Sequence, residues 1–306
     1  LKDLTTFSKA RFTEDDLKVA DKIFCWGEDD FKTLKQLFNN AQNKLLLSGS
    51  HRFDMMRSEF NNYWEFTKLH SKQITISGNF NLVNGYINQT KIISELENQG
   101  YFLRSDKYKD ELINIIDDTE KKFKEFFKMI KEIIHKFPDE NFHLRPHPLE
   151  KIETWQEHFS EYKNVKISKD GNINEQLVNS KILIHNSCTT AFHSFFYNIP
   201  TISYEPIECK SNYGETANEL SERTRNVEEL IDAISVIKKN KYQISNKDFK
   251  KNLFNHKVFR PKDIYSAQII VNEWKKISNF STENEINFTK IKSELFKKNV
   301  IYNLKK

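Results

Sequence analysis

The chain has 306 residues, and its 48 Lys and Arg outnumber its 43 Asp and Glu, for a formal net charge of +5. This excess fits an anionic ligand or an anionic membrane face, but it is too diffuse to indicate a nucleic-acid-binding protein. The three cysteines are too few and too scattered for a disulfide framework or a zinc site, and no apolar run approaches the roughly 20 residues of a membrane span. We therefore expect a cytoplasmic protein.

The first part of the chain predicts a single β-α-β unit. Its elements are a strand that ends in glycine, a helix with acidic residues in its first turn and a second strand, over residues 22–27, 28–41 and 44–49. Residues 50–57 then cross to the next part. Because the chain begins with Leu1 and the first strand lacks an obvious earlier partner, we expect this unit to be the end of a larger sheet domain that starts upstream.

From residue 73 onward, short apolar runs alternate with helical periodicity. The expected strands cover residues 73–80, 142–145, 165–168, 182–185 and 201–204. The expected helices cover residues 107–136, 150–160, 173–179, 189–198, 227–238 and 263–276, with Asn226 as the N-cap of the fifth. This alternation is typical of a doubly wound α/β domain with a parallel sheet.

We expect three regions, with the first boundary between about residues 58 and 73. Residues 1–65 would be the C-terminal part of an N-terminal Rossmann-like domain, residues 66–277 a second Rossmann-like domain, and residues 278–306 a basic helical tail. The lysines of the tail are consistent with a solvated helix and with a membrane-surface patch.

Polar side chains gather where three of the predicted strands end, in residues 142–148, 182–191 and 200–206. Ligands of open α/β sheets bind beyond the carboxyl ends of the strands. In the first segment, Arg145 could grip a phosphate or a carboxylate with two hydrogen bonds, and His147 could donate a hydrogen bond to a leaving phosphate oxygen. An exposed turn with an incidental histidine explains the same spacing equally well.

The second segment passes from a strand into a helix. Ser187 or Thr189 would cap that helix, and the free backbone N–H groups of its first turn would form an anion site. The polar residues of this candidate phosphate-binding turn are His185, Asn186, Ser187, Thr189 and Thr190. Helix capping without a ligand is the alternative, but the neighbouring Arg145 and His147 favour ligand binding.

Five further residues are weaker candidates: His193, Glu205, Asn79, Arg52 and Asp54. The histidine lies one helical turn beyond the candidate phosphate turn, and the glutamate could accept hydrogen bonds from ribose or sugar hydroxyls. The asparagine follows the first strand of the second domain, and the last two residues could border an acceptor site. Each of them also has a structural explanation. His193 could be a core or surface histidine, Glu205 an exposed carboxylate and Asn79 part of a simple turn. Arg52 and Asp54 could serve local helix capping and a surface ion pair.

Several known motifs are missing from the sequence. It has no phosphate-binding loop, no dinucleotide-binding fingerprint and no nucleophile elbow. We therefore expect no resident cofactor and no bound metal.

Six segments together carry a family resemblance: residues 20–27, 48–54, 78–84, 144–148 with Trp155, 185–191 and 199–204. They resemble the bacterial surface carbohydrate biosynthesis protein family, over about residues 18–275. That family has a GT-B-type glycosyltransferase fold. It is similar, more distantly, to capsule Kdo transferases and to the CDP-glycerol glycerophosphotransferases of teichoic acid synthesis.

The resemblance implies an α/β, GT-B-like fold of two Rossmann-like domains with parallel sheets, of which this chain carries the first only in part. The second domain would bind a nucleotide-linked donor without a metal. Carried over by position, Arg145 and His147 would be catalytic and contact the donor's phosphate or sugar acid, and the turn at 185–190 would bind phosphate. The family usually has an acidic residue where His193 stands, which leaves the nucleotide preference open.

The expected function is transfer of a sugar, such as the CMP-activated sugar acid Kdo, from a nucleotide donor to a bacterial surface polysaccharide or its lipid-linked precursor. The nucleotide-sugar is a co-substrate, nucleic acid is not an expected partner, and the cytoplasmic face of the inner membrane is an expected peripheral contact. Two alternatives stay open: a CDP-polyol phosphotransferase, and a catalytically inactive nucleotide-sugar-binding subunit.

Overall fold

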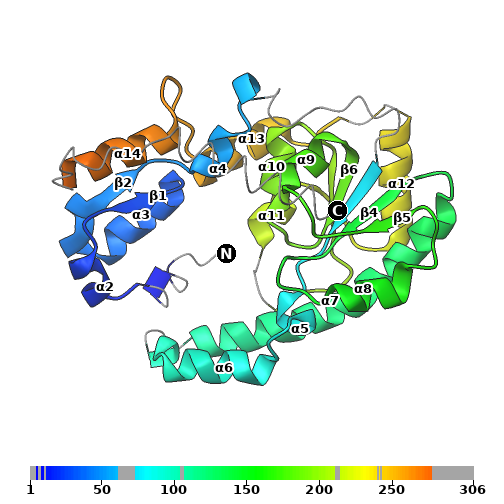
Figure 1. Cartoon of the computed structure of the whole chain (residues 1–306), viewed down its shortest axis with the longest axis horizontal. Helices are drawn as coiled ribbons and strands as arrows, with labels where there is room; N and C mark the ends of the chain where they lie inside the picture. The colour runs from blue at the N-terminus through cyan, green and yellow to red at the C-terminus, as the bar shows by residue number, and fades with distance from the viewer. Residues whose placement is uncertain are drawn as a thin grey trace, which may run out of the picture. The chain divides into compact units, whose positions relative to one another are not determined.

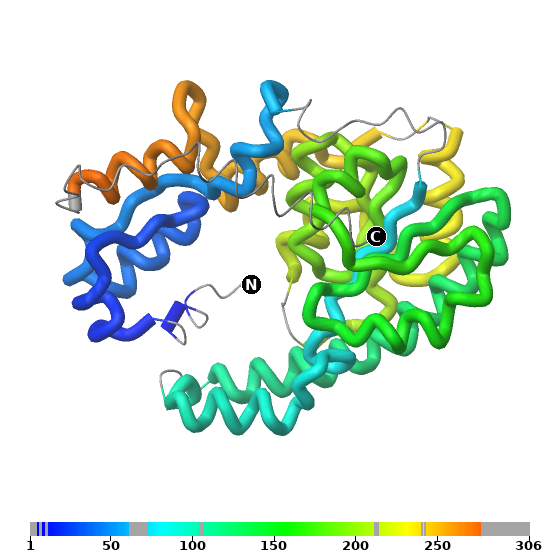
Figure 2. The backbone as a smooth tube through the Cα atoms, in the orientation of Figure 1, coloured from blue at the N-terminus to red at the C-terminus, as the bar shows by residue number. Residues whose placement is uncertain are grey.

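The computed structural model describes residues 5, 8, 9, 12–60, 73–103, 107–210, 214–239, 241 and 243–277. The residues up to Ala267 form one compact unit, which holds both sheets (Figure 1), and the residues from Gln268 form another. Figure 2 traces the backbone in the same orientation. The domain boundary expected near residue 65 lies outside the described residues, as does the basic tail expected over residues 278–306.

The N-terminal part forms the β-α-β unit that its sequence predicts. Its elements are α2 (Glu14–Val19), β1 (Ile23–Cys25), α3 (Glu28–Leu37), the 3-10 helix η1 (Asn39–Lys44), β2 (Leu45–Leu47) and α4 (His51–Asp54). Strands β1 and β2 pair in parallel. Leu34 of α3 packs with Cys25 and Leu45 of the strands in a small core of its own.

A second sheet has six strands, all parallel. The alternating pattern predicts the first five of them in chain order and misses the sixth, β8. They are β3 (Gln73–Ser77), β4 (Phe142–Arg145), β5 (Val165–Ile167), β6 (Ser180–His185), β7 (Thr201–Tyr204) and β8 (Glu222–Thr224). Their spatial order is β5-β4-β3-β6-β7-β8. The order turns around at β3, so the carboxyl ends of β4, β3 and β6 border the switch point where ligands of such sheets bind.

Helices connect these strands (Figure 1). They are α5 (Asn81–Asn84), α6 (Gln89–Asn98), the 3-10 helix η3 (Tyr101–Leu103), α7 (Tyr108–Lys136), α8 (Ile152–Phe159), α9 (Ile173–Val178), α10 (Thr190–Phe196), α11 (Glu215–Glu219), α12 (Val227–Lys238), α13 (Lys247–Lys257) and α14 (Ser266–Ile277). Asn226 caps α12 as predicted. None of the described helices combines the length and the apolar character needed to cross a membrane.

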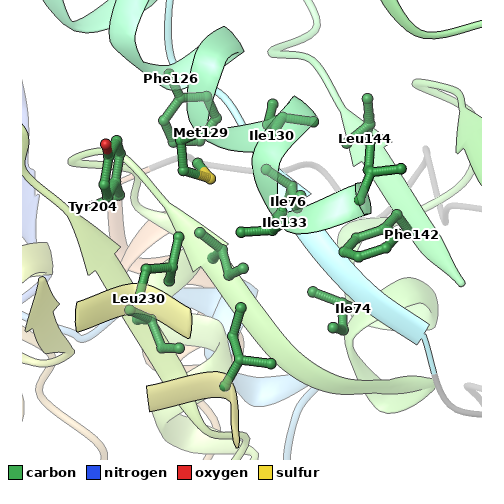
Figure 3. Packing of buried hydrophobic residues seen from close by; sticks show 14 of the residues in the cluster. Ile74, Ile76, Phe126, Met129, Ile130, Ile133, Phe142, Leu144, Tyr204 and Leu230 are labelled. Carbon is green, nitrogen blue, oxygen red and sulfur yellow. The ribbon is translucent and has the colours of Figure 1, made fainter. Parts of the chain in front are cut away.

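One face of the six-stranded sheet carries the main hydrophobic core. Side chains alternate along a strand, and Ile74, Ile76 and Leu144 point to the same side, where Ile130 and Ile133 of α7 cover them (Figure 3). Helices α8 and α12 complete this core with residues such as Trp155 and Leu230. These side chains are fully buried, so the face is a closed apolar layer.

The other face of the same strands is polar and supports the ligand side. The alternate positions hold Thr75 and Ser77 on β3, His143 on β4 and His185 on β6, and all four are buried. Their polar atoms bond to serines near the strand ends: Thr75 to Ser180, His143 to Ser168 and His185 to Ser221. Helices α9, α10 and α11 lie against β6 and β7, so this polar layer sits between the sheet and the helices that frame the candidate site.

Candidate functional site

A cavity of about 570 Å³ opens at the carboxyl ends of β3, β4 and β6, at the switch point of the sheet. We call it the carboxyl-end cavity. Its lining is His51, Arg52, Met55, Ser77, Gly78, Arg145, Pro146, His147, Pro148, Gly171, Asn172, Ile173, Asn174, Cys188, Thr189, Thr190 and His193. Six of the residues singled out from the sequence are therefore brought together here: Arg52, Arg145, His147, Thr189, Thr190 and His193.

The charged side chains that line the cavity are all positive. Two arginines and three histidines line the cavity, and its lining includes no aspartate, glutamate or lysine. Among the described residues, those of the cavity included, no group of three or more His, Cys, Asp or Glu side chains is placed to hold a metal ion. The cavity thus presents fixed positive charge and neutral hydrogen-bonding groups, which is the environment that an anion requires.

A larger cavity, of about 1070 Å³, lies at the opposite edge of the sheet, beside Glu140, Ser180 and Pro200 at the amino ends of the strands. Its only carboxylate, Glu140, is already paired with Lys181 and with Lys238 at 2.8 Å. By volume alone, this larger cavity would be the stronger candidate for a ligand site. We place the candidate site at the carboxyl ends, because the switch point coincides there with Arg52 and Arg145, which form no ion pair with any residue that the structure describes.

Arg145 ends β4 and is anchored before any ligand arrives. Its Nη1 donates to the Asp170 carbonyl at 2.8 Å, and its Nη2 donates to the Gly171 carbonyl at 2.9 Å. Burial lowers the pKa of the guanidinium, which nevertheless stays charged at neutral pH. Because two of the five N–H groups hold the loop after β5, the guanidinium is fixed in direction and keeps donors for an anion.

His147 follows Arg145 in a closed turn. The Glu150 N–H donates to the His147 carbonyl at 2.8 Å, and the Leu149 N–H donates to Nδ1 of the ring at 3.2 Å. Burial lowers the pKa of the ring, while Glu150 opposes this shift and Lys169 adds to it. The ring is therefore neutral at pH 7, with Nδ1 engaged by the backbone.

In the turn after β6, three of the residues predicted to bind phosphate, His185, Asn186 and Ser187, do not line the carboxyl-end cavity. His185 is fully buried: its Nδ1 accepts from the Cys188 N–H at 3.2 Å, and its Nε2 bonds to Ser221 at 2.8 Å. Asn186 is also buried, and its Oδ1 accepts from the Asn79 N–H at 3.0 Å. Asn79, His185 and Asn186 do not line the cavity. Through these hydrogen bonds they hold the backbone of the turn from the protein interior.

Ser187 also turns away from the cavity. It adopts a left-handed backbone conformation with φ 48°, and its hydroxyl oxygen accepts from Asn218 at 3.2 Å. Gly214 lies so close that a Cβ there would fall 2.2 Å from the Ser187 Cβ. Of the two residues predicted to cap α10, Thr189 occupies the N-cap position, but its side chain makes no cap hydrogen bond.

Thr189 and Thr190 are the residues of this turn that reach the cavity. The Thr190 hydroxyl lies 3.0 Å from the Cys188 sulfur and 3.4 Å from the Ser77 hydroxyl. Helix α10 spans seven residues, so we assign the anion-binding capacity of this side to the hydroxyls rather than to the helix.

His193 lines the cavity one turn into α10, although its spacing alone left a core or surface histidine open. Its Nδ1 lies 2.8 Å from Oδ1 of Asn174, a cavity residue that the sequence reasoning missed. Burial lowers the pKa of His193 to about 4, and the nearby Arg52 acts in the same direction. The ring is therefore neutral, and it does not replace the negative charge of a carboxylate at this position.

Arg52 and Asp54, both expected on the acceptor side, have separate roles. Arg52 lines the cavity, with its guanidinium carbon 5.5 Å from the centre of the Trp26 ring. Asp54 does not line it: its carboxylate accepts from the backbone N–H groups of Ser266 and Ala267, at 3.0 and 2.8 Å. Asp54 is thus a buried capping residue, which is the structural alternative left open by the sequence.

Replacing Asp54 with alanine should lower the free energy of unfolding by about 1–2 kcal/mol, because the buried Ser266 N–H and the partly buried Ala267 N–H lose their acceptor. Urea denaturation of the full chain measures this loss. The exposed Asp21, replaced in the same way, is the control and should change little. Unchanged stability in the Asp54 variant would contradict the capping role.

Glu205 lies outside the lining of the carboxyl-end cavity. It forms an ion pair with Arg223 of β8, and its Oε1 accepts from the Ser203 hydroxyl at 2.7 Å. A second carboxylate, Glu215, holds the same arginine at 2.8 Å. The carboxylate expected to accept sugar hydroxyls is therefore occupied by a structural pair.

Sequence reasoning missed Glu150, which organises the site without lining it. Its buried carboxylate accepts hydrogen bonds from several segments around His147. It lies three residues after His147, in a loop with no periodic pattern. The signal that could have found it is a carboxylate directly after a Pro-His-Pro turn, where backbone N–H groups need an acceptor.

No family model matches the chain, and no curated protein matches it either. Solved structures do match. The chain is similar to the wall teichoic acid polymerase TagF, with a TM-score of 0.51 at 13% sequence identity. It is also similar to a variant of that polymerase soaked with CDPG, with a TM-score of 0.50 at 14% identity. In each comparison the match covers 86% of this chain and 60% of the other.

A further similar structure, S. aureus MnaA with UDP, has a TM-score of 0.46 at 14% identity, over 88% of this chain and 63% of that one. The chain thus spans less than two thirds of the length of the solved structures it matches. At these identities the likeness to TagF concerns the fold. The chain has an α/β, GT-B-like fold with parallel sheets.

Proposed function

We propose that the chain is a GT-B-type glycosyltransferase that binds the phosphate of a nucleotide-sugar donor in the carboxyl-end cavity. The observation that carries the proposal is the lining, which combines Arg52 and Arg145 with three histidines and contains no carboxylate or lysine. A dianionic phosphate would meet fixed cations without a repelling charge. The fold shared with a wall polymer enzyme supports the same class of chemistry.

In the proposed reaction, the acceptor hydroxyl attacks the sugar carbon and the bond from that carbon to the nucleotide phosphate breaks. Negative charge then develops on the departing phosphate. Arg145, held by two carbonyls, would stabilise this charge, and His147 would donate a hydrogen bond to a phosphate oxygen. Since the cavity lining offers no carboxylate, a base for the acceptor hydroxyl would come from the acceptor side of the enzyme.

The finer assignments rest on the family resemblance. The donor would be a CMP-activated sugar acid such as Kdo, and the acceptor a bacterial surface polysaccharide or its lipid-linked precursor at the cytoplasmic face of the inner membrane. No metal is needed in this scheme, because the two arginines supply the positive charge. Thr189, Thr190 and His193 would complete the donor site.

A second candidate is transfer of a polyol phosphate from a CDP-linked donor. It is favoured by the similarity to the polymerase variant with CDPG. In this reaction the acceptor hydroxyl attacks phosphorus instead of a sugar carbon, and CMP leaves. The same two arginines suit both reactions, so the identity of the donor separates them.

A thermal-shift screen of the full chain with CMP, CDP, UDP and GDP tests the proposal. A ligand at 100 times its Kd stabilises the folded state by about 2.7 kcal/mol, which for a chain of this size raises Tm by roughly 5–10 °C. We expect the cytidine nucleotides to give the largest shift. No shift with any of the four would overturn the donor-site assignment. A shift without transfer or donor hydrolysis would instead identify an inactive binding subunit.

A further inference from the structure

The carboxylate of Glu150 accepts hydrogen bonds from four N–H donors in three segments. Oε1 accepts from the backbone N–H groups of Phe80 at 2.9 Å and His147 at 3.0 Å. Oε2 accepts from the Trp155 indole at 2.9 Å and from the Asn84 amide at 3.4 Å. The side chain is 0% exposed, and among the described residues no lysine or arginine forms an ion pair with it. A buried carboxylate without a counter-charge is costly, so its stabilising value alone does not account for it.

These four donors surround the turn that carries His147. Phe80 and Asn84 follow β3, the turn itself follows β4, and Trp155 lies in α8. The Glu150 backbone closes the turn through its N–H bond to the His147 carbonyl, and Lys169 donates to the Glu150 carbonyl at 2.9 Å. Glu150 therefore fixes the backbone of the turn from its side chain and from its main chain.

The fixed turn decides which nitrogen of His147 carries the proton. The Leu149 N–H points at Nδ1 from 3.2 Å, so Nδ1 must accept and cannot itself carry hydrogen. In the neutral ring the proton then resides on Nε2. With Nδ1 occupied, Nε2–H is the polar edge that the ring retains for a ligand in the cavity it lines.

We propose that Glu150 is a positioning residue that locks this turn and thereby presents His147 to the cavity as a neutral Nε2–H donor. The role of that donor rests on the proposed function, in which it bonds to a phosphate oxygen of the nucleotide. In this arrangement His147 cannot act as a base through Nε2, because that nitrogen already holds its proton.

Glu150→Gln is the sharpest test, because it keeps the volume and changes the hydrogen bonding. A glutamine has a single acceptor oxygen, so its NH₂ group must face either the two backbone N–H groups or the Trp155 and Asn84 donors. On the side that the NH₂ group faces, N–H donors then meet another donor and lose their acceptor. The matched control is Glu153→Gln, because Glu153 is exposed on α8 three positions further on.

Side-chain ¹⁵N NMR of the full chain with labelled histidine reads the tautomer directly, with the His147 signal assigned by its loss in His147→Gln. We expect the wild type and Glu153→Gln to show the Nε2–H form, and Glu150→Gln to show a mixture of tautomers. Affinity for CDP should fall about tenfold in Glu150→Gln and stay within twofold in the control. If Glu150→Gln does not fold, Glu150→Asp, which withdraws the carboxylate by one methylene, is measured with the same expectations.

An Nδ1–H form in the wild type would overturn the proposal, as would an unchanged Nε2–H form in folded Glu150→Gln. The two parts of the inference fail separately. A shift of the tautomer with unchanged CDP affinity supports the positioning role and refutes the contact of His147 with phosphate. Absence of binding of CMP, CDP, UDP and GDP alike in the wild type refutes the proposed function, while the tautomer measurement still decides the role of Glu150.

Discussion

Replacing Arg145 with alanine is expected to weaken CDP binding by roughly 30- to 150-fold, equivalent to about 2–3 kcal/mol. The reason is geometric as well as electrostatic. The guanidinium is held by the carbonyls of Asp170 and Gly171, so it faces the cavity without having to be ordered by the ligand. Isothermal titration of the variant with CDP measures the loss.

Two further variants show whether the loss belongs to this site. Arg145→Lys keeps the charge, but a single ammonium cannot hold both carbonyls and a phosphate in the same fork, so most of the loss should remain. Arg225 is exposed and lies outside the cavity lining, and Arg225→Ala should bind CDP like the wild type. Equal affinities of Arg145→Ala and Arg225→Ala would remove Arg145 from the site.

The strands of the main sheet were predictable because their apolar runs are short and sharply bounded. Both β4 and β7 begin and end where the sequence places them, since an Arg-Pro step and a Glu-Pro step stop them. The three residues of β8, Glu-Arg-Thr, contain no apolar side chain. That strand exists through its pairing with β7 and the burial of Thr224, and neither is visible in a local pattern.

The sequence places the candidate site at the carboxyl ends of the strands, and some of the residues that it singles out line the cavity found there. A switch point follows from strand order, and Arg145, His147 and His193 do line the cavity. In the turn after β6, the left-handed backbone of Ser187 redirects the chain, so His185 and Ser187 turn to the interior while the threonines reach the cavity. A sequence run does not reveal such a reversal when the residue concerned is not glycine.

Residue pairs that are distant along the chain were the other source of error. Glu205 is bound by Arg223, 18 positions away, and Asp54 by backbone groups more than 200 positions away. Both carboxylates looked available because their partners lie in elements that the sequence pattern did not bring near. Glu150 shows the converse case, where a residue with no motif of its own gathers four donors from separate segments.

The second large effect is expected with pH: the folded state should lose stability steeply as the pH falls below about 6.5. Burial lowers the pKa of His143 to about 4, of His185 to about 3 and of His193 to about 4. In the unfolded chain these rings titrate near 6.5. Above that pH they are neutral in both states and their contribution is fully present. Below that pH, the three rings are protonated in the unfolded chain but stay neutral in the folded chain. The free energy of unfolding therefore decreases as the pH is lowered.

Each such histidine costs about 1.4 kcal/mol per pH unit in this window, and three together cost about 4 kcal/mol per unit. At pH 5 the loss relative to neutral pH is about 6 kcal/mol, so a domain at the lower end of the usual range of about 5–15 kcal/mol should unfold near this pH. Urea denaturation between pH 7.5 and 5 measures the slope, which corresponds to about three protons. His143→Gln, whose ring bonds to Gln73 and Ser168, should reduce the slope by one proton even if it lowers stability at every pH. The exposed His158, replaced by glutamine, should leave the slope unchanged, and a flat profile in the wild type would show that the buried rings accept protons in the folded state.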